Sequence, residues 1–166
     1  MTVQHGLWIS VLVMAFGCAG TAPGPAGKVG PAMGRLADCP DSPNCVSSLA
    51  PASDAQHHIA ALPLAVDRGL AMVWLRRSAL ELPGAELAAM GPDYLRVECK
   101  SRVFGFVDDL ELSLDPEAPV VQVRSASRLG YGDMGVNRER VEALRLLLQR
   151  GEAGGETSGQ TEAGQP

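Results

Sequence analysis

The sequence predicts an α+β fold: a single small domain with an antiparallel four-stranded sheet and two helices packed on one face. The first observation is the order of patterns: helical spacing of apolar residues, four short strand-like segments, then helical spacing again. The second is length, because about 110 residues remain once both ends are set aside, enough for one core. Placing both helices on one face of the sheet buries both apolar surfaces most simply.

Two segments place apolar residues three and four positions apart, as the buried face of a helix requires. The first is residues 65–80, and Pro83-Gly84 ends it. The second begins near Asn137, whose side chain we expect to cap the helix, and ends at Gly151. The apolar residues are Val66, Leu70, Val73 and Trp74 in the first segment, and Val141, Leu144 and Leu148 in the second.

Four short segments between these helices are expected to form the sheet. They are residues 85–90, 94–101, 106–114 and 120–127. Successive side chains of a strand point to opposite faces, so one face of the sheet should collect apolar residues. The other face should collect charged residues.

The charged face is expected to carry a lattice of ion pairs. If the last hairpin places Glu111 opposite Arg124, Asp109 falls within diagonal reach of Arg124 and Arg128. Asp108 points the other way, toward the apolar face. A carboxylate there is costly unless it is paired or hydrogen-bonded.

Asp108 should therefore form a structural clamp between the sheet and the following loop, with Ser127, Arg138 or loop amides as partners. Since Asp108 and Asp109 face opposite ways, they cannot act as a close acid–base pair. The alternative is a hydrolase-like enzyme that uses one of these aspartates with the two neighbouring arginines.

The net charge, the histidine spacing and the position of Cys99 argue against a nucleic-acid surface, a metal site and a reactive thiol. A net charge of −5 disfavours a nucleic-acid surface, which needs clustered basic charge. His57 and His58 are adjacent and fit no standard zinc spacing, so we expect no metal and no other cofactor. Cys99 points to the apolar face, which predicts a buried and inert thiol.

The N-terminal residues predict export. The apolar segment 7–16 is followed by Gly17 and Cys18, a junction that resembles a bacterial lipobox. We expect residues 1–17 to be a signal peptide of the lipoprotein type and Cys18 to carry lipid. The domain would then be membrane-anchored in the cell envelope, facing the periplasm, at an inner or outer membrane that the sequence does not decide. The alternative is cleavage just beyond Gly20, which would give a soluble periplasmic protein.

The rest of the chain divides by composition. Residues 18–38 are rich in Ala, Gly and Pro and predict a flexible tether. Residues 39–150 form the expected domain, and residues 151–166 the expected disordered tail. In an oxidising compartment, Cys39 and Cys45 are close enough in sequence to form a disulfide.

The loop between the last strand and the last helix is the richest in polar residues. Backbone N–H groups at a helix start, with arginines nearby, suit a phosphate or carboxylate. This predicts a non-catalytic module for a small anionic ligand or an envelope protein partner; the alternative is that the polar residues only hold the fold. The candidate residues are Asp109, Arg124, Arg128, Gly130, Asp133, Asn137 and Arg138.

Three separated motifs over residues 39–149 resemble a bacterial and plastid family, the domain of unknown function 1499. The resemblance implies that these residues matter together and that many relatives are envelope proteins, and it implies no activity. The motifs are Cys39-Pro-Asp-Ser-Pro-Asn-Cys45-Val-Ser-Ser48, Phe106-Val-Asp-Asp109, and Arg124-Ser-Ala-Ser-Arg128 followed by Gly130, Asp133, Gly135, Asn137, Arg138 and Arg140.

Overall fold

A computed structural model describes residues 36–155 of the chain. The predicted signal peptide, Cys18 and most of the predicted tether and tail lie outside these residues. The elements, in chain order, are β1 (Cys45–Ser47), β2 (Leu62–Pro63), α1 (Arg68–Leu80), β3 (Ala85–Met90), β4 (Tyr94–Lys100), β5 (Val107–Leu114), β6 (Val120–Ser127) and α2 (Val136–Gly155).

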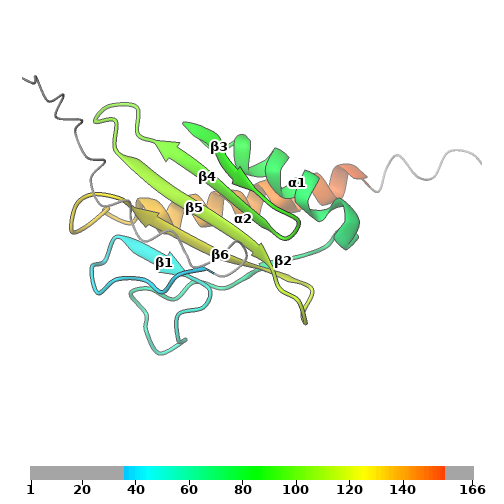
Figure 1. Ribbon diagram of the computed structural model, residues 1–166, viewed down its shortest axis with the longest axis horizontal. Helices are drawn as coiled ribbons and strands as arrows, with labels where there is room; N and C mark the ends of the chain where they lie inside the picture. Colours follow the sequence, from blue (N-terminus) through cyan, green and yellow to red (C-terminus); the bar gives the residue numbers. More distant parts are fainter. Residues whose placement is uncertain (1–35, 156–166) are drawn as a thin grey trace, which may run out of the picture.

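The sheet is antiparallel throughout and confirms the α+β class, but it has six strands where the sequence predicts four. Four of them follow the order β6-β5-β4-β3, each beside its neighbour in the chain. The two additional strands, β1 and β2, both pair with the outer edge of β6 (Figure 1). They contain three and two residues, which is too short for an alternating pattern to reveal them.

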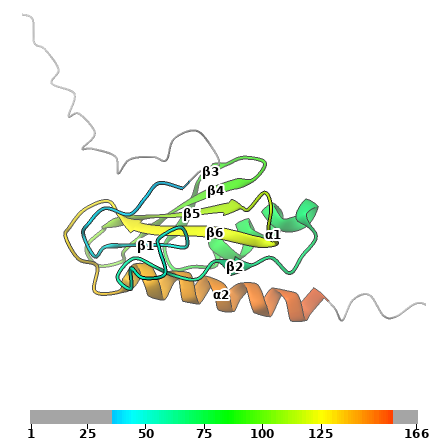
Figure 2. The ribbon, with the colours of Figure 1, turned by 90° about the horizontal axis from the view of Figure 1, so that it is seen from below.

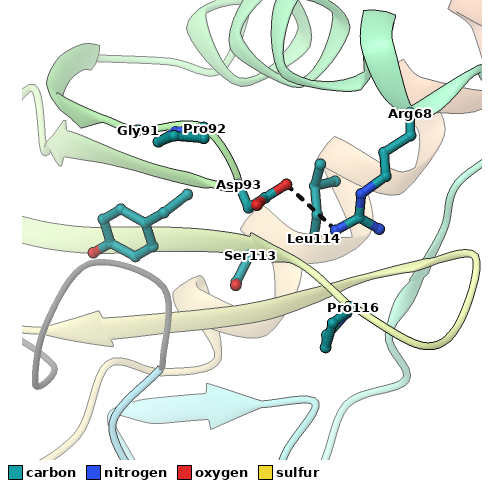
Figure 3. A pocket seen from close by; sticks show the side chains of 8 residues that line it. Arg68, Gly91, Pro92, Asp93, Ser113, Leu114 and Pro116 are labelled. Carbon is teal, nitrogen blue, oxygen red and sulfur yellow. Dashed lines mark hydrogen bonds and ion pairs between the residues drawn. The ribbon is translucent and has the colours of Figure 1, made fainter.

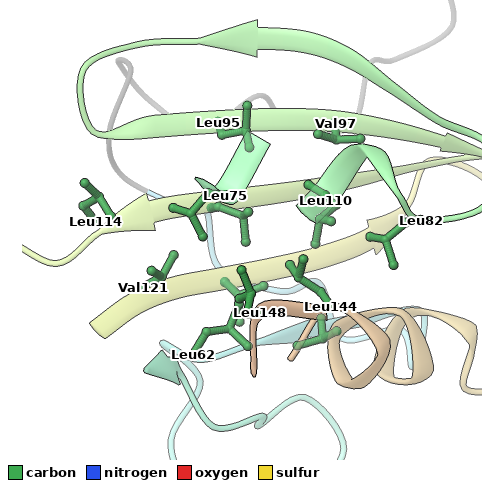
Figure 4. Packing of buried hydrophobic residues seen from close by; sticks show 14 of the residues in the cluster. Leu62, Leu75, Leu82, Leu95, Val97, Leu110, Leu114, Val121, Leu144 and Leu148 are labelled. Atoms are coloured by element: carbon green, nitrogen blue, oxygen red, sulfur yellow. The ribbon is translucent and has the colours of Figure 1, made fainter. Parts of the chain in front are cut away.

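The helices α1 and α2 lie on the same face of the sheet, as Figure 2 shows for α2 beneath the strands. Their apolar residues join those of the strands in one core (Figure 4). Fully buried members from the strands include Leu95, Leu110 and Val123, and α2 contributes Leu144. The two helices therefore close the apolar face of the sheet and leave its other face to the charged side chains.

Both helices differ from their predicted bounds, and α1 differs also in its buried face. Asp67 caps α1 by accepting a hydrogen bond from the backbone N–H of Gly69 at 2.8 Å, so the helix begins later than expected. Its buried residues are not the predicted stripe, because Leu70 and Val73 are 64% and 66% exposed. At the other end of the chain, α2 continues to Gly155 and so passes the predicted stop at Gly151. A glycine weakens a helix but does not end it when the backbone hydrogen bonds continue.

Within the described part of the chain, no helix is long and apolar enough to cross a membrane.

Candidate functional site

The loop that precedes β1 is closed by the predicted disulfide between Cys39 and Cys45, whose Cα atoms are 5.6 Å apart. This loop ends in Asn44, which is 5% exposed. The Asn44 side-chain amide donates to the carbonyl of Gly130 at 2.6 Å, and the backbone carbonyl of Asn44 accepts the N–H of Ser127 at 3.0 Å. The disulfide loop is thereby tied to the end of β6 and to the loop that follows it.

Asn137 is the centre of a buried polar cluster and has no exposed surface. Its amide nitrogen donates to the Asn44 carbonyl at 3.0 Å and to the Ser127 hydroxyl at 2.9 Å. Its amide oxygen accepts from the Ser125 hydroxyl at 2.6 Å and from Arg140 at 2.5 Å. All four hydrogen-bonding positions of the amide are used, as the burial of a polar side chain requires.

The prediction that Asn137 caps α2 is therefore wrong. The cap is Asp133, whose carboxylate accepts from the backbone N–H groups of Gly135 at 3.0 Å and Asn137 at 2.8 Å. The sequence held a signal for this arrangement. Asn137 precedes Val141 by four positions and so belongs to the buried face of α2.

Asp108 is held by an ion pair, but its partner is Arg140 rather than Ser127, Arg138 or a loop amide, so the clamp ties the sheet to α2 and not to the loop. The Asp108 carboxylate and the Arg140 guanidinium lie 2.5 Å apart, and each side chain is 11% exposed. Arg140 also donates to the Ser125 hydroxyl at 3.0 Å. Because Arg140 follows Asn137 by three positions on α2, both side chains reach the same region of the sheet.

Beside this ion pair lies Cys99, which stands opposite Asp108 in the register of β4 and β5. The thiol is free and only 2% exposed, as expected from its inward position. Burial raises the pKa of the Cys99 thiol, and the nearby Asp108 carboxylate adds to this effect. A thiol that keeps its proton is a poor nucleophile.

The opposite face of the sheet carries the predicted lattice of charges, with Glu111 directly across from Arg124. The Arg124 guanidinium lies 2.9 Å from the Glu111 carboxylate, and the Tyr94 hydroxyl donates to the same carboxylate at 2.6 Å. All three residues are buried, with exposures between 2% and 8%. The Arg124 Nε atom is itself buried and has no hydrogen-bond partner.

Arg128 extends this lattice at the end of β6. Its guanidinium makes two hydrogen bonds of 2.8 Å to the Asp109 carboxylate and one of 2.5 Å to Glu98. The hydrogen bonds to Asp109 are the main reason that the pKa of Arg128 is raised. A guanidinium that makes two hydrogen bonds to one carboxylate forms a charge-assisted contact that is stronger than a hydrogen bond between neutral groups.

Arg138 points away from both groups. It donates to the backbone carbonyls of His58 at 2.9 Å, Gln56 at 3.1 Å and Ala55 at 3.4 Å. It thus fastens α2 to the segment between β1 and β2.

The model of the family described as "Protein of unknown function (DUF1499)" matches residues 35–148. The chain belongs to this family. A search of the curated proteins finds no match.

The three motifs of the DUF1499 domain meet at one end of the sheet. The disulfide loop, the start of β5 and the segment from β6 to α2 are joined through Asn44, Asp108 and Asn137. The residues that we predicted as one binding surface are, however, divided between the two faces of the sheet. Asp109, Arg124 and Arg128 lie on the charged face, whereas Asn137, in the first turn of α2, contacts Ser125 and Ser127 of β6 from the face that the helices cover.

The histidines of the DUF1499 domain have structural partners. The Nδ1 atom of His57 lies 2.7 Å from the Asp54 carboxylate, and this hydrogen bond is the main cause that lowers the pKa of Asp54. The Nδ1 atom of His58 lies 2.8 Å from the Ala50 carbonyl. Over residues 36–155, no group of three or more His, Cys, Asp or Glu side chains is placed to hold a metal ion.

A pocket of about 320 Å³, which the sequence did not predict, lies at the other end of the sheet (Figure 3). It opens between the β3–β4 turn and the β5–β6 turn. Arg68 crosses it, 3.3 Å from the Asp93 carboxylate and 2.7 Å from the Asp115 carbonyl. Both charged side chains of that pair are about half exposed, at 47% and 55%, so the ion pair lies at the mouth of an open surface depression. Its lining residues are Arg68, Gly91, Pro92, Asp93, Tyr94, Ser113, Leu114 and Pro116.

Tyr94 predicts how the stability of the domain depends on alkaline pH. Burial, and then the hydrogen bond to Glu111, raise the pKa of Tyr94 above its ordinary value of 10.0. The folded chain therefore keeps a proton that the unfolded chain loses, and the free energy of unfolding should fall as the pH rises above 10. Urea unfolding between pH 8 and 11 measures this slope.

Tyr94→Phe should make that slope shallower, because the variant has no hydroxyl to ionise. Tyr131→Phe is the matched control, since it removes a hydroxyl from a side chain that is 78% exposed. Equal slopes for the wild type and Tyr94→Phe would contradict the assignment.

Proposed function

We propose that this chain is a lipid-anchored protein of the cell envelope whose domain is a non-catalytic module that presents a surface to another component of the envelope. The observation that carries the proposal is the pairing of the arginines at the end of the sheet where the three motifs meet. Arg124 and Arg128 bind carboxylates, Arg138 binds backbone carbonyls, and Arg140 binds Asp108. These groups hold the fold.

The same pairing disfavours the hydrolase-like alternative. A general acid or base must reach the proton that it moves. The Asp108 carboxylate is occupied by an ion pair with Arg140, and the Asp109 carboxylate by one with Arg128. The two carboxylates also lie on opposite faces of β5. Cys99 is buried, and burial raises the pKa of its thiol, which disfavours a nucleophilic thiolate. A small anionic ligand would have to displace one of these partners before it could reach a guanidinium.

The disulfide supports the proposed location. Such bonds persist in oxidising compartments such as the periplasm and are rare in the cytosol. Together with the Gly17-Cys18 junction, the disulfide favours an exported domain held to a membrane by lipid on Cys18, facing the periplasm. Several acyl chains on one residue would make the attachment stable, whereas a single chain binds marginally.

Intact-mass measurement of the protein purified from native membranes tests this proposal. We expect a chain that begins at Cys18, carries acyl groups and lacks the two thiol hydrogens of Cys39 and Cys45. The Cys18→Ser variant should lack the acyl mass and should not form the mature, membrane-anchored chain. A native chain that retains Met1, with Cys39 and Cys45 reduced, would refute the envelope location.

A chain that begins just beyond Gly20 without lipid would leave the domain in the periplasm but remove the anchor.

A further inference from the structure

Two loops lie side by side at the end of the sheet where the three motifs meet. Residues 101–106 join β4 to β5, and residues 128–135 join β6 to α2. The backbone N–H of Arg128 donates to the Val107 carbonyl at 3.2 Å, so the two loops start from adjacent strands. Figures 1 and 2 both place them at the same end of the domain. We call this surface the loop end.

The loop end collects the most exposed apolar side chains of the domain. Within residues 36–155, every large apolar side chain that is at least 70% exposed lies in these two loops. Phe106 adds a further aromatic ring at 52% exposure. The residues at or above 70% are Val103 at 82%, Phe104 at 76%, Leu129 at 70%, Tyr131 at 78% and Met134 at 97%. Exposed apolar residues gathered in this way mark an interaction surface.

These side chains are held outward by ordered backbone. The hairpin loop is closed by a hydrogen bond of 2.8 Å from the Ser101 N–H to the Phe106 carbonyl, and the Ser101 hydroxyl accepts the Phe106 N–H at 3.0 Å. The rings of Phe104 and Phe106 stack with centroids 5.7 Å apart. In the other loop, Met134 adopts a left-handed φ of 55°, a conformation that costs a non-glycine residue energy. The surface is therefore preformed.

The charge of the loop end is opposite to that of the whole chain. The two loops contain Arg102, Arg128 and the acidic Asp133, and Lys100 at the end of β4 adjoins them, although the chain carries a net charge of −5. Arg128 is paired with Asp109 and Glu98. The acidic residue, Asp133, is occupied as the cap of α2. Lys100 and Arg102 are exposed, and neither forms an ion pair with another described residue. Two uncommitted positive charges thus flank the apolar tips.

We propose that the loop end docks on the surface of a phospholipid bilayer. Aromatic and aliphatic side chains flanked by basic residues suit the membrane interface, where the rings enter the headgroup region and the cations meet lipid phosphates. The apolar groups project as tips from two loops, a shape that enters a deformable lipid layer. This inference rests on the proposed lipid anchor, which would keep the domain close to a membrane.

A depth-sensitive probe on the lipidated full chain tests the docking. Phe104→Cys is labelled with the fluorophore NBD, which brightens and shifts to the blue when it leaves water. Leu146→Cys, 58% exposed on α2, carries the matched control label, and the unsubstituted chain corrects for labelling of Cys99. In vesicles of phosphatidylethanolamine and phosphatidylglycerol, the probe at position 104 should brighten and shift, while the probe at position 146 should keep the signal that it has in water.

The outcomes separate docking from anchoring. If the chain sediments with the vesicles but the probe at position 104 keeps the signal that it has in water, the docking is overturned and the anchor is left intact. A chain that does not sediment with vesicles at all would instead refute the anchor. A probe at position 104 that responds only when envelope proteins are added would also overturn the docking, because the occupant would then be a protein.

The flanking cations supply a second measurement. Lys100→Gln with Arg102→Gln should lower the docked-to-undocked ratio about thirtyfold in anionic vesicles, at about 1 kcal/mol for each basic residue near the surface. In vesicles of phosphatidylcholine alone, the same double variant should match the parent chain. An unchanged ratio in anionic vesicles would contradict the role of these two residues.

Discussion

Replacing Arg140 with alanine should lower the free energy of unfolding by about 3–5 kcal/mol, the loss found when one member of a buried ion pair is removed. The change strands the Asp108 carboxylate, which is 8% exposed on the apolar face of the sheet. It also removes the Arg140 hydrogen bonds that the Asn137 amide oxygen and the Ser125 hydroxyl oxygen accept. Urea unfolding followed by circular dichroism measures the loss.

Two further variants show whether the loss comes from the buried charge. Combining Asp108→Leu with Arg140→Met should recover much of the stability, because a buried ion pair can be replaced by apolar residues at little cost. Arg77→Ala is the matched surface control: the Arg77 side chain is 83% exposed and lies 3.9 Å from Glu81, so its loss should stay below about 1 kcal/mol. If Arg140→Ala were as mild as Arg77→Ala, the clamp would not hold the fold.

Gly84→Ala should be almost as damaging, with a loss of about 3 kcal/mol or more from strain and steric overlap. Gly84 has a positive φ of 68°, and an added Cβ would lie 2.2 Å from the Lys100 carbonyl oxygen. That backbone cannot move freely, because the Lys100 N–H donates to the Gly84 carbonyl at 2.9 Å where β3 meets β4. Thermal unfolding gives the comparison.

Gly132→Ala is the control for this substitution, since an added Cβ there has no neighbour within 4 Å. Its effect should stay within about 0.5 kcal/mol, as for most surface changes. Equal melting temperatures for the two alanine variants would show that the Gly84 turn has room to relax.

Periodicity predicted those elements whose patterns are long. The stripe Val141, Leu144 and Leu148 is buried, at 1% exposure or less, because α2 packs against β6, β1 and α1. The alternation of β5 and β6 also placed Glu111 and Arg124 on the same charged face, because the pleat fixes which face each side chain takes. The register that sets them directly opposite was a condition of that prediction, and the structure supplies it.

Other features depend on contacts that a linear pattern does not contain. In α1 the face turned to the core joins Leu75 to the smaller or flexible residues Ala71, Met72, Ser78 and Ala79. The apolar Leu70 and Val73 therefore misled the assignment of its buried face. The strands β1 and β2 exist because β6 offers them an edge, and their own sequences are too short to indicate it.

The candidate site was predicted in composition but not in arrangement. The sequence singled out Asp108, Asn137 and their neighbours as polar groups that need partners. The partner of Asp108 could not be assigned, because Arg138 and Arg140 both follow Asn137 closely and the sequence does not fix which side of α2 turns toward Asp108. Asn137 is separated from Arg124 and Arg128 because it meets the helix-covered face of the sheet, whereas they lie on the charged face.

A titration of the arginine side chains by NMR tests the role of the paired guanidinium groups most directly. With phosphate or acetate added to the 15N-labelled protein, we expect no saturable shift in the Nε–H signals of Arg124, Arg128, Arg138 and Arg140. Protein acceptors already engage each guanidinium group, and the unpaired Nε of Arg124 is buried. A saturable shift at Arg128, accompanied by shifts in the backbone amides of residues 130–137, would show that the cluster is an anion site.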